Sequence, residues 1–150
     1  MKFVATLALA AAVFGIASPA SAQFAKPEDA VKYRQSALFV MSQHFGRIGA
    51  MANGRAPYDA KAAVDNAEVV AEMAKLPWAG FVANTEGLSQ KAKAEIWKEQ
   101  AKFKEHNEKL VGDTGRLLAA AKTNNLDNVK AAFTQTAATC KACHDNFRNQ

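Results

Sequence analysis

Residues 126–148 read LDNVKAAFTQTAATCKACHDNFR, and this stretch decides the fold of the chain. Its apolar and small side chains recur at intervals of three and four: Leu126, Val129, Phe133, Thr136, Cys140, Cys143 and Phe147. This spacing is typical of one face of an amphipathic α-helix. Asn125 precedes the segment as a predicted N-cap. Because both cysteines lie on the core-facing stripe, any group that they hold is expected to lie between helices.

The same stretch contains Cys140-Lys141-Ala142-Cys143-His144, which is the Cys-x-x-Cys-His signature of covalent c-type haem. Residues three and four apart share a helix face, so the two thiols and the imidazole can point at one porphyrin. The thiols add to the haem vinyl groups, and the histidine becomes an axial ligand of the iron. We predict one covalent haem c per subunit, with Cys140 and Cys143 as attachment sites and His144 as the metal ligand.

Other interpretations of the cysteine pair fit less well. A thioredoxin-like redox pair belongs to a βαβ unit, and the sequence shows no strand pattern. Zinc would need two further ligands, and His44 and His106 are the only other histidines. A disulfide across one helical turn would leave His144 unexplained.

Three further segments have helical periodicity, and clusters of Gly, Pro and Asn separate them. We predict helices over about 27–51, 59–76, 91–122 and 126–148, with the longest connection over 77–90. Pro77 is expected to end the second helix, because proline disfavours helix in the residue before it. Glycines at 46, 49, 112 and 115 lie inside these helices and allow close helix approach. Four amphipathic helices predict an all-α protein, an antiparallel four-helix bundle with its haem near the C-terminus.

Residues 1–22 have the features of a secretory signal peptide. Lys2 is followed by the apolar run from Val4 to Ile16, and the segment ends in Ala20-Ser21-Ala22. Its removal would leave 23–150 as one domain, which we expect to be periplasmic and without a membrane anchor. The whole chain has a formal net charge of +5. Because the charge is spread without a basic block, nucleic-acid binding is not expected.

The position of the haem motif, in the last helix, resembles the class II cytochromes c and within them cytochrome c′. The resemblance covers 23–150 and includes residues 23–30, Tyr33-Arg34-Gln35, Leu76-Pro77-Trp78, Phe81, Glu95-Ile96-Trp97, and the haem motif with Arg148. It implies a five-coordinate, high-spin iron with His144 as its only protein ligand. It also implies binding of nitric oxide and carbon monoxide, strong discrimination against dioxygen, and a homodimer in which the first helices cross.

The resemblance also implies roles for individual side chains around the haem. Leu38 corresponds to the apolar residue over the open face of the iron, and Arg148 to an arginine beside the proximal imidazole. An apolar pocket agrees with the gas preference, since it offers no hydrogen-bond donor to dioxygen.

The remaining candidates come from the residues themselves. Arg34 interrupts an apolar stripe and needs a partner, for which a haem propionate, with help from Gln35, is the natural choice. Trp78, Phe81 and Phe133 are candidates for the apolar wall of the haem pocket.

The alternative to gas binding is a low-spin electron-transfer cytochrome. In that case Met41, three residues after Leu38, would be the sixth ligand of the iron. Redox partner proteins are compatible with both readings. Catalytic removal of nitric oxide lacks a visible proton-delivery group, so we predict neither catalytic residues nor an enzymatic activity.

Overall fold

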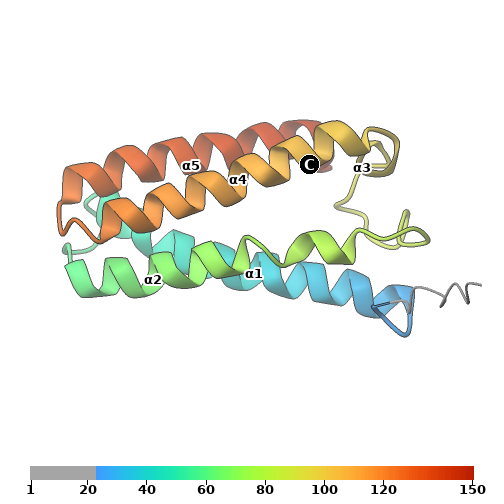
Figure 1. The fold of residues 1–150 in the computed structure, drawn as a ribbon, viewed down its shortest axis with the longest axis horizontal. Coiled ribbons are helices and arrows are strands. Elements are labelled where there is room, and N and C mark those ends of the chain that lie inside the picture. Colours follow the sequence, from blue (N-terminus) through green and yellow to red (C-terminus); the bar gives the residue numbers. More distant parts are fainter. Residues whose placement is uncertain (1–22) are drawn as a thin grey trace, which may run out of the picture.

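The computed structural model describes residues 23–150, and the predicted signal peptide lies outside the described residues. The helices are α1 (Pro27–Ala52), α2 (Ala60–Met73), the 3-10 helix η1 (Pro77–Gly80), α3 (Glu95–Lys98), α4 (Gln100–Ala121) and α5 (Leu126–Phe147). The predicted four-helix bundle is confirmed: α1 runs along α2, α4 runs along α5, and the two pairs pack together (Figure 1). No helix within the described residues is long and apolar enough to cross a membrane.

The ends of the long helices follow from local side-chain chemistry. Pro27 begins α1, and Glu28 and Asp29 lie at the positive end of its dipole. Asp59 caps α2 by accepting a hydrogen bond from the backbone N–H of Ala62 at 2.9 Å. Asn125 caps α5 in the same way, as predicted, by accepting from the two backbone N–H groups of residues 127 and 128.

The core of the bundle is apolar, and every long helix contributes to it. Ile48 of α1, Val70 of α2, Leu117 of α4 and Val129 of α5 are almost completely buried. These four side chains belong to one contiguous cluster, which holds the two helix pairs together along the bundle.

The prediction of one helix over 91–122 is wrong. The segment 91–94 is not helical, α3 is a single short turn, and Glu99 breaks the helix with φ −110° and ψ 47°. The reason is a tertiary contact: the N–H of Lys93 donates to the carbonyl of Phe147 at 3.0 Å, and the N–H of Asn149 donates to the carbonyl of Lys91 at 3.1 Å. These bonds hold 91–93 in a non-helical conformation beside the end of α5.

Pro77 does not end α2 in the predicted manner. The helix ends at Met73, three residues before its predicted end at residue 76. Leu76 keeps helical dihedrals of φ −90° and ψ −42°. Pro77 instead begins η1, where its fixed φ suits a first helical turn. The indole N–H of Trp78 donates to the carbonyl of Ala74 at 2.6 Å, which satisfies one of the free carbonyls at the end of α2.

Candidate haem site

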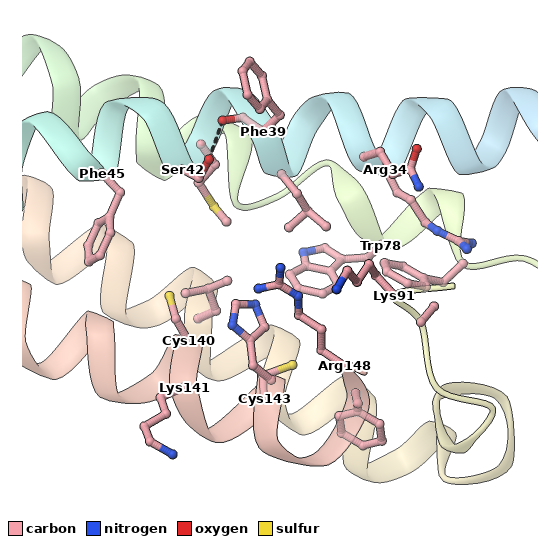
Figure 2. A pocket seen from close by; sticks show the side chains of 18 of the residues that line it. Arg34, Phe39, Ser42, Phe45, Trp78, Lys91, Cys140, Lys141, Cys143 and Arg148 are labelled. Carbon is pink, nitrogen blue, oxygen red and sulfur yellow. Dashed lines mark hydrogen bonds between the residues drawn. The ribbon is translucent and has the colours of Figure 1, made fainter. Parts of the chain in front are cut away.

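A cavity of about 750 Å³ lies between the bundle helices, with α1 and α5 facing each other across it (Figure 2). This volume is within the range of sites that hold large organic ligands. The predicted site residues that line it are Arg34, Gln35, Leu38, Trp78, Phe81, Cys140, Cys143, His144 and Arg148. No single helix carries the site. The structure brings together residues from α1, η1, the following loop and α5.

Cys140 and Cys143 are free thiols, half-buried on the cavity side of α5. Burial raises the pKa of the Cys140 thiol, and burial together with the neighbouring Cys140 raises the pKa of Cys143 to about 11. Buried thiols of raised pKa differ from the reactive, low-pKa cysteines of redox pairs. Within residues 23–150, no three His, Cys, Asp or Glu side chains come together to hold a metal ion by themselves.

His144 and Arg148 lie at the same end of the cavity, next to the C-terminus of α5. Desolvation, and then the charge of Arg148, lower the pKa of His144. The imidazole is therefore favoured in its neutral form, which is the form that binds a metal.

The expectation that Arg148 continues the helix is wrong. It is extended, with φ −119° and ψ 131°, and pairs with Ala92 in an isolated antiparallel bridge. Its N–H still donates to the carbonyl of His144 at 3.0 Å. The loop therefore holds the arginine beside the histidine, which helical spacing alone does not explain.

Arg34 is a buried cation on α1, with only 2% of its surface exposed. Its Nη1 donates to the carbonyl of Gly80 at 2.7 Å and to Thr85 Oγ1 at 2.8 Å, and its guanidinium lies 4.5 Å from the centre of the Phe81 ring. Its Nη2 is buried without a partner in the described residues, and burial lowers the pKa of the group. Sequence reasoning missed Gly80 and Thr85, because nothing in the sequence reveals that η1 and the loop reach α1.

The α1 wall of the cavity is apolar at its centre. Leu38 and Met41 both line it, and Met41 is buried. The hydroxyl of Ser42, the next polar group on this wall, donates to the carbonyl of Phe39 at 2.7 Å (Figure 2). No free donor is therefore presented by this stretch of α1.

The prediction that Phe133 belongs to the haem wall is wrong. Phe133 does not line the cavity and instead stacks on Phe45, with the ring centres 4.5 Å apart. A Cβ on Gly49 would lie 2.6 Å from the Phe133 ring, so this glycine allows α1 and α5 to approach closely. Sequence reasoning also missed Phe45, Phe103 and Lys91, which do line the cavity.

These residues fit a haem. Two unpaired thiols and a neutral imidazole lie on one wall, apolar groups lie opposite, and an unpartnered buried Nη2 can accept a carboxylate. Cys140 and Cys143 would hold the ring covalently, His144 would bind its iron, and Arg34 would bind a propionate. The fold and this site together define a c-type haem protein built on a four-helix bundle.

Comparison with known proteins agrees. The family described as Cytochrome C′ matches residues 29–148. A cytochrome c′ of Alcaligenes xylosoxydans is 48% identical over 128 residues, which cover 85% of this chain and 99% of that protein. The crystal structure of cytochrome c′ from Rubrivivax gelatinosus has a TM-score of 0.81 and 43% identity, covering 85% of this chain and 100% of that one.

One of the similar structures was solved with a gas ligand. It is a nitric oxide complex of an engineered variant of cytochrome c prime from Alcaligenes xylosoxidans, with a TM-score of 0.80 and 47% identity. It covers 85% of this chain and 99% of that one. The chain belongs to the cytochrome c′ family, and covalent haem c is its cofactor.

Proposed function

We propose that this protein binds diatomic gases, chiefly nitric oxide and also carbon monoxide, at an open haem iron. The observation that carries the proposal is the apolar α1 wall, where Leu38 lies and the nearby Ser42 hydroxyl is occupied by a backbone carbonyl. When bound, the haem supplies an iron with one coordination position free for a small ligand. The stretch of α1 from Leu38 to Ser42 offers no free donor to polarised dioxygen, whereas nitric oxide and carbon monoxide need less such help.

The chain's own residues support binding without turnover. His144 would bind the iron, Arg34 and Gln35 would orient the ring, and Leu38 would limit access to the iron. The cavity contains no carboxylate among the described residues, so it offers no acidic group for repeated proton delivery. We therefore propose a sequestering role and not an enzymatic one.

The absorption spectrum of the purified haem protein tests the proposal. We expect a broad, unsplit visible band in the reduced form and prompt formation of a nitrosyl complex. Sharp, well-resolved bands without ready reaction with nitric oxide would contradict it.

A low-spin electron carrier is the second candidate, and the buried position of Met41 on the cavity wall favours it. Replacing Met41 by Ala separates the two functions. Loss of a low-spin spectrum would support the carrier, and an unchanged high-spin spectrum would remove Met41 as a ligand.

We further propose that the protein acts in the periplasm as a homodimer. The signal-like features of residues 1–22 support export. The outer face of α1 supports self-association, because Phe39 is 64% exposed and Val40 lies next to it. Sedimentation of the haem protein with Phe39→Glu checks the dimer: we expect a monomer, and an unchanged dimer would place the interface elsewhere.

A further inference from the structure

The haem cavity is rich in cations and has no acid in its described wall. Four basic side chains line it: Arg34, Lys91, Lys141 and Arg148. Lys141 forms an ion pair with Asp145, with N and O 2.6 Å apart, whereas the other three form no ion pair within residues 23–150. Arg34 is buried, so its unpaired charge is costly, whereas Lys91 and Arg148 are solvent-exposed. Three cations without an acidic partner still make the cavity complementary to a ligand that brings more than one negative charge.

Two hydrogen bonds hold the loop around Lys91 at the end of the cavity where Arg34 lies. The carbonyl of Lys91 accepts from the N–H of Asn149, and two residues earlier Ser89 Oγ accepts from Gln35 Nε2 at 3.4 Å. The second bond brings the loop against α1, beside Arg34. Figure 2 shows Lys91 reaching into the cavity on the side of Arg34, with Cys140 toward the opposite side.

The chemistry of haem matches this arrangement. Its two vinyl groups, which react with the thiols, and its two propionates lie on opposite edges of the ring. A ring attached at Cys140 and Cys143 therefore directs its propionates away from the cysteines, toward the Arg34 end. Arg34 and Gln35 can hold one propionate, and the second needs another cation.

We propose that Lys91 is the counter-ion of the second haem propionate and thereby raises the reduction potential of the iron. A positive charge near the ring stabilises the reduced iron, which carries one positive charge fewer than the oxidised form. The inference rests on the haem cofactor and is independent of gas binding.

Lys93 provides a matched control on the same loop. It carries the same charge two residues further on but does not line the cavity, and its Nζ donates to the backbone carbonyl of Asp145 at 3.0 Å. Lys91→Met and Lys93→Met thus remove one charge each from neighbouring positions. Lys91→Arg keeps the charge at the cavity.

The test is a spectroelectrochemical titration of the three haem-loaded variants and the unaltered protein, at equal haem content. We expect Lys91→Met to lower the reduction potential, so that the reduced-to-oxidised ratio at a fixed potential falls about two- to fivefold. Lys93→Met should leave the potential unchanged, and Lys91→Arg should restore it. Equal shifts in the two methionine variants, or no shift in Lys91→Met, would overturn the proposal.

Two further measurements distinguish a failure of the Lys91 proposal from a failure of the gas-binding proposal. Lys91→Gln repeats the charge removal with a polar side chain, and it should lower the potential as Lys91→Met does. Nitrosyl formation by Lys91→Met should remain intact. If the unaltered protein formed no nitrosyl complex, the gas-binding function would be rejected, and the role of Lys91 would be unaffected.

Discussion

At the scale of single residues, the protein keeps a cation where an apolar side chain would be expected. Arg34 is tolerated inside the fold because a carbonyl, a hydroxyl and an aromatic face surround its guanidinium. Thr85 is as buried as the arginine, and its hydroxyl donates a hydrogen bond to the carbonyl of Val82 at 2.7 Å. The stability of this end of the bundle therefore depends on a polar network.

Replacing Thr85 by Val tests that network. The change keeps the shape of the side chain but removes one of the two acceptors of Arg34 Nη1, so we expect a loss of about 1–3 kcal/mol in the free energy of unfolding. Urea unfolding of the haem protein, followed by circular dichroism, measures it. Thr134→Val on the exposed face of α5 is the control, and an equal effect in both variants would contradict the network.

Gly49 has a clear steric role. A Cβ there would press on the Phe133 ring, whereas a Cβ on Gly115 of α4 would meet nothing within 4 Å. We expect Gly49→Ala to destabilise the protein by about 1–3 kcal/mol through overpacking. Gly115→Ala should stabilise it by about 0.5–1 kcal/mol, because alanine is the better helix former. Thermal unfolding of both variants gives the sign, and a stabilising Gly49→Ala would contradict the close approach.

At the scale of elements, one buried carboxylate joins α4 to α5. Asp113 accepts from Thr139 Oγ1 at 2.6 Å, and it is paired with Lys109 and Arg116 of its own helix. Burial alone would raise the pKa of Asp113, but the hydrogen bonds from Thr139, Arg116 and Lys109 outweigh it and lower the pKa. Because Thr139 precedes Cys140, this contact also fixes the helix turn that carries the haem motif.

The lowered pKa predicts a pH dependence of stability. Since the folded pKa lies below the unfolded one, the stabilisation is complete above the ordinary pKa of an aspartate and disappears as the pH falls through the folded pKa. Asp113→Asn should therefore cost about 1–3 kcal/mol near neutral pH and progressively less in acid. Chemical unfolding at a series of pH values measures the difference.

Asp65→Asn is the control for that experiment. Asp65 is exposed and pairs with Lys61 on the surface of α2, so its replacement should change little at any pH. A cost of Asp113→Asn that stays constant from neutral to acid pH would contradict the pH argument.

At the scale of the whole molecule, the bundle is built around space for its cofactor. The walls of the cavity come from α1, α2, η1, the loop, α3 and both C-terminal helices. Aromatic rings on these walls contact one another, for example Phe81 and Phe103 with centres 4.9 Å apart. A folded bundle without haem would leave these side chains without packing partners on the cavity side.

Removal of the covalent haem should therefore weaken the whole fold. We expect the double variant Cys140→Ala and Cys143→Ala to lose at least about 4 kcal/mol of unfolding free energy, as for a ligand held far above its dissociation constant. Thermal unfolding followed at 222 nm measures this loss. A double variant that purifies without haem yet unfolds like the parent would show that the cavity is not filled by the cofactor.

The sequence by itself determined the helical class, the four main segments and the haem motif. These features are local: helical periodicity, caps such as Asn125, and the spacing of Cys140, Cys143 and His144 are properties of neighbouring residues. Motifs along the whole of 23–150 resemble those of cytochrome c′, and this resemblance indicated the family. The predicted helix over 91–122 failed because its first residues bond to the end of α5, a partner that is distant in sequence.

Only the tertiary structure decided how the charges around the haem cavity are arranged. The partners of Arg34 come from η1 and the loop, 46 and 51 residues away, and Lys91 is positioned by bonds to α1 and to the C-terminus. Such contacts depend on where the helices are placed in space, which residue spacing does not encode. Local interactions thus fixed the helices and the haem attachment motif, and long-range packing fixed the surroundings of the haem.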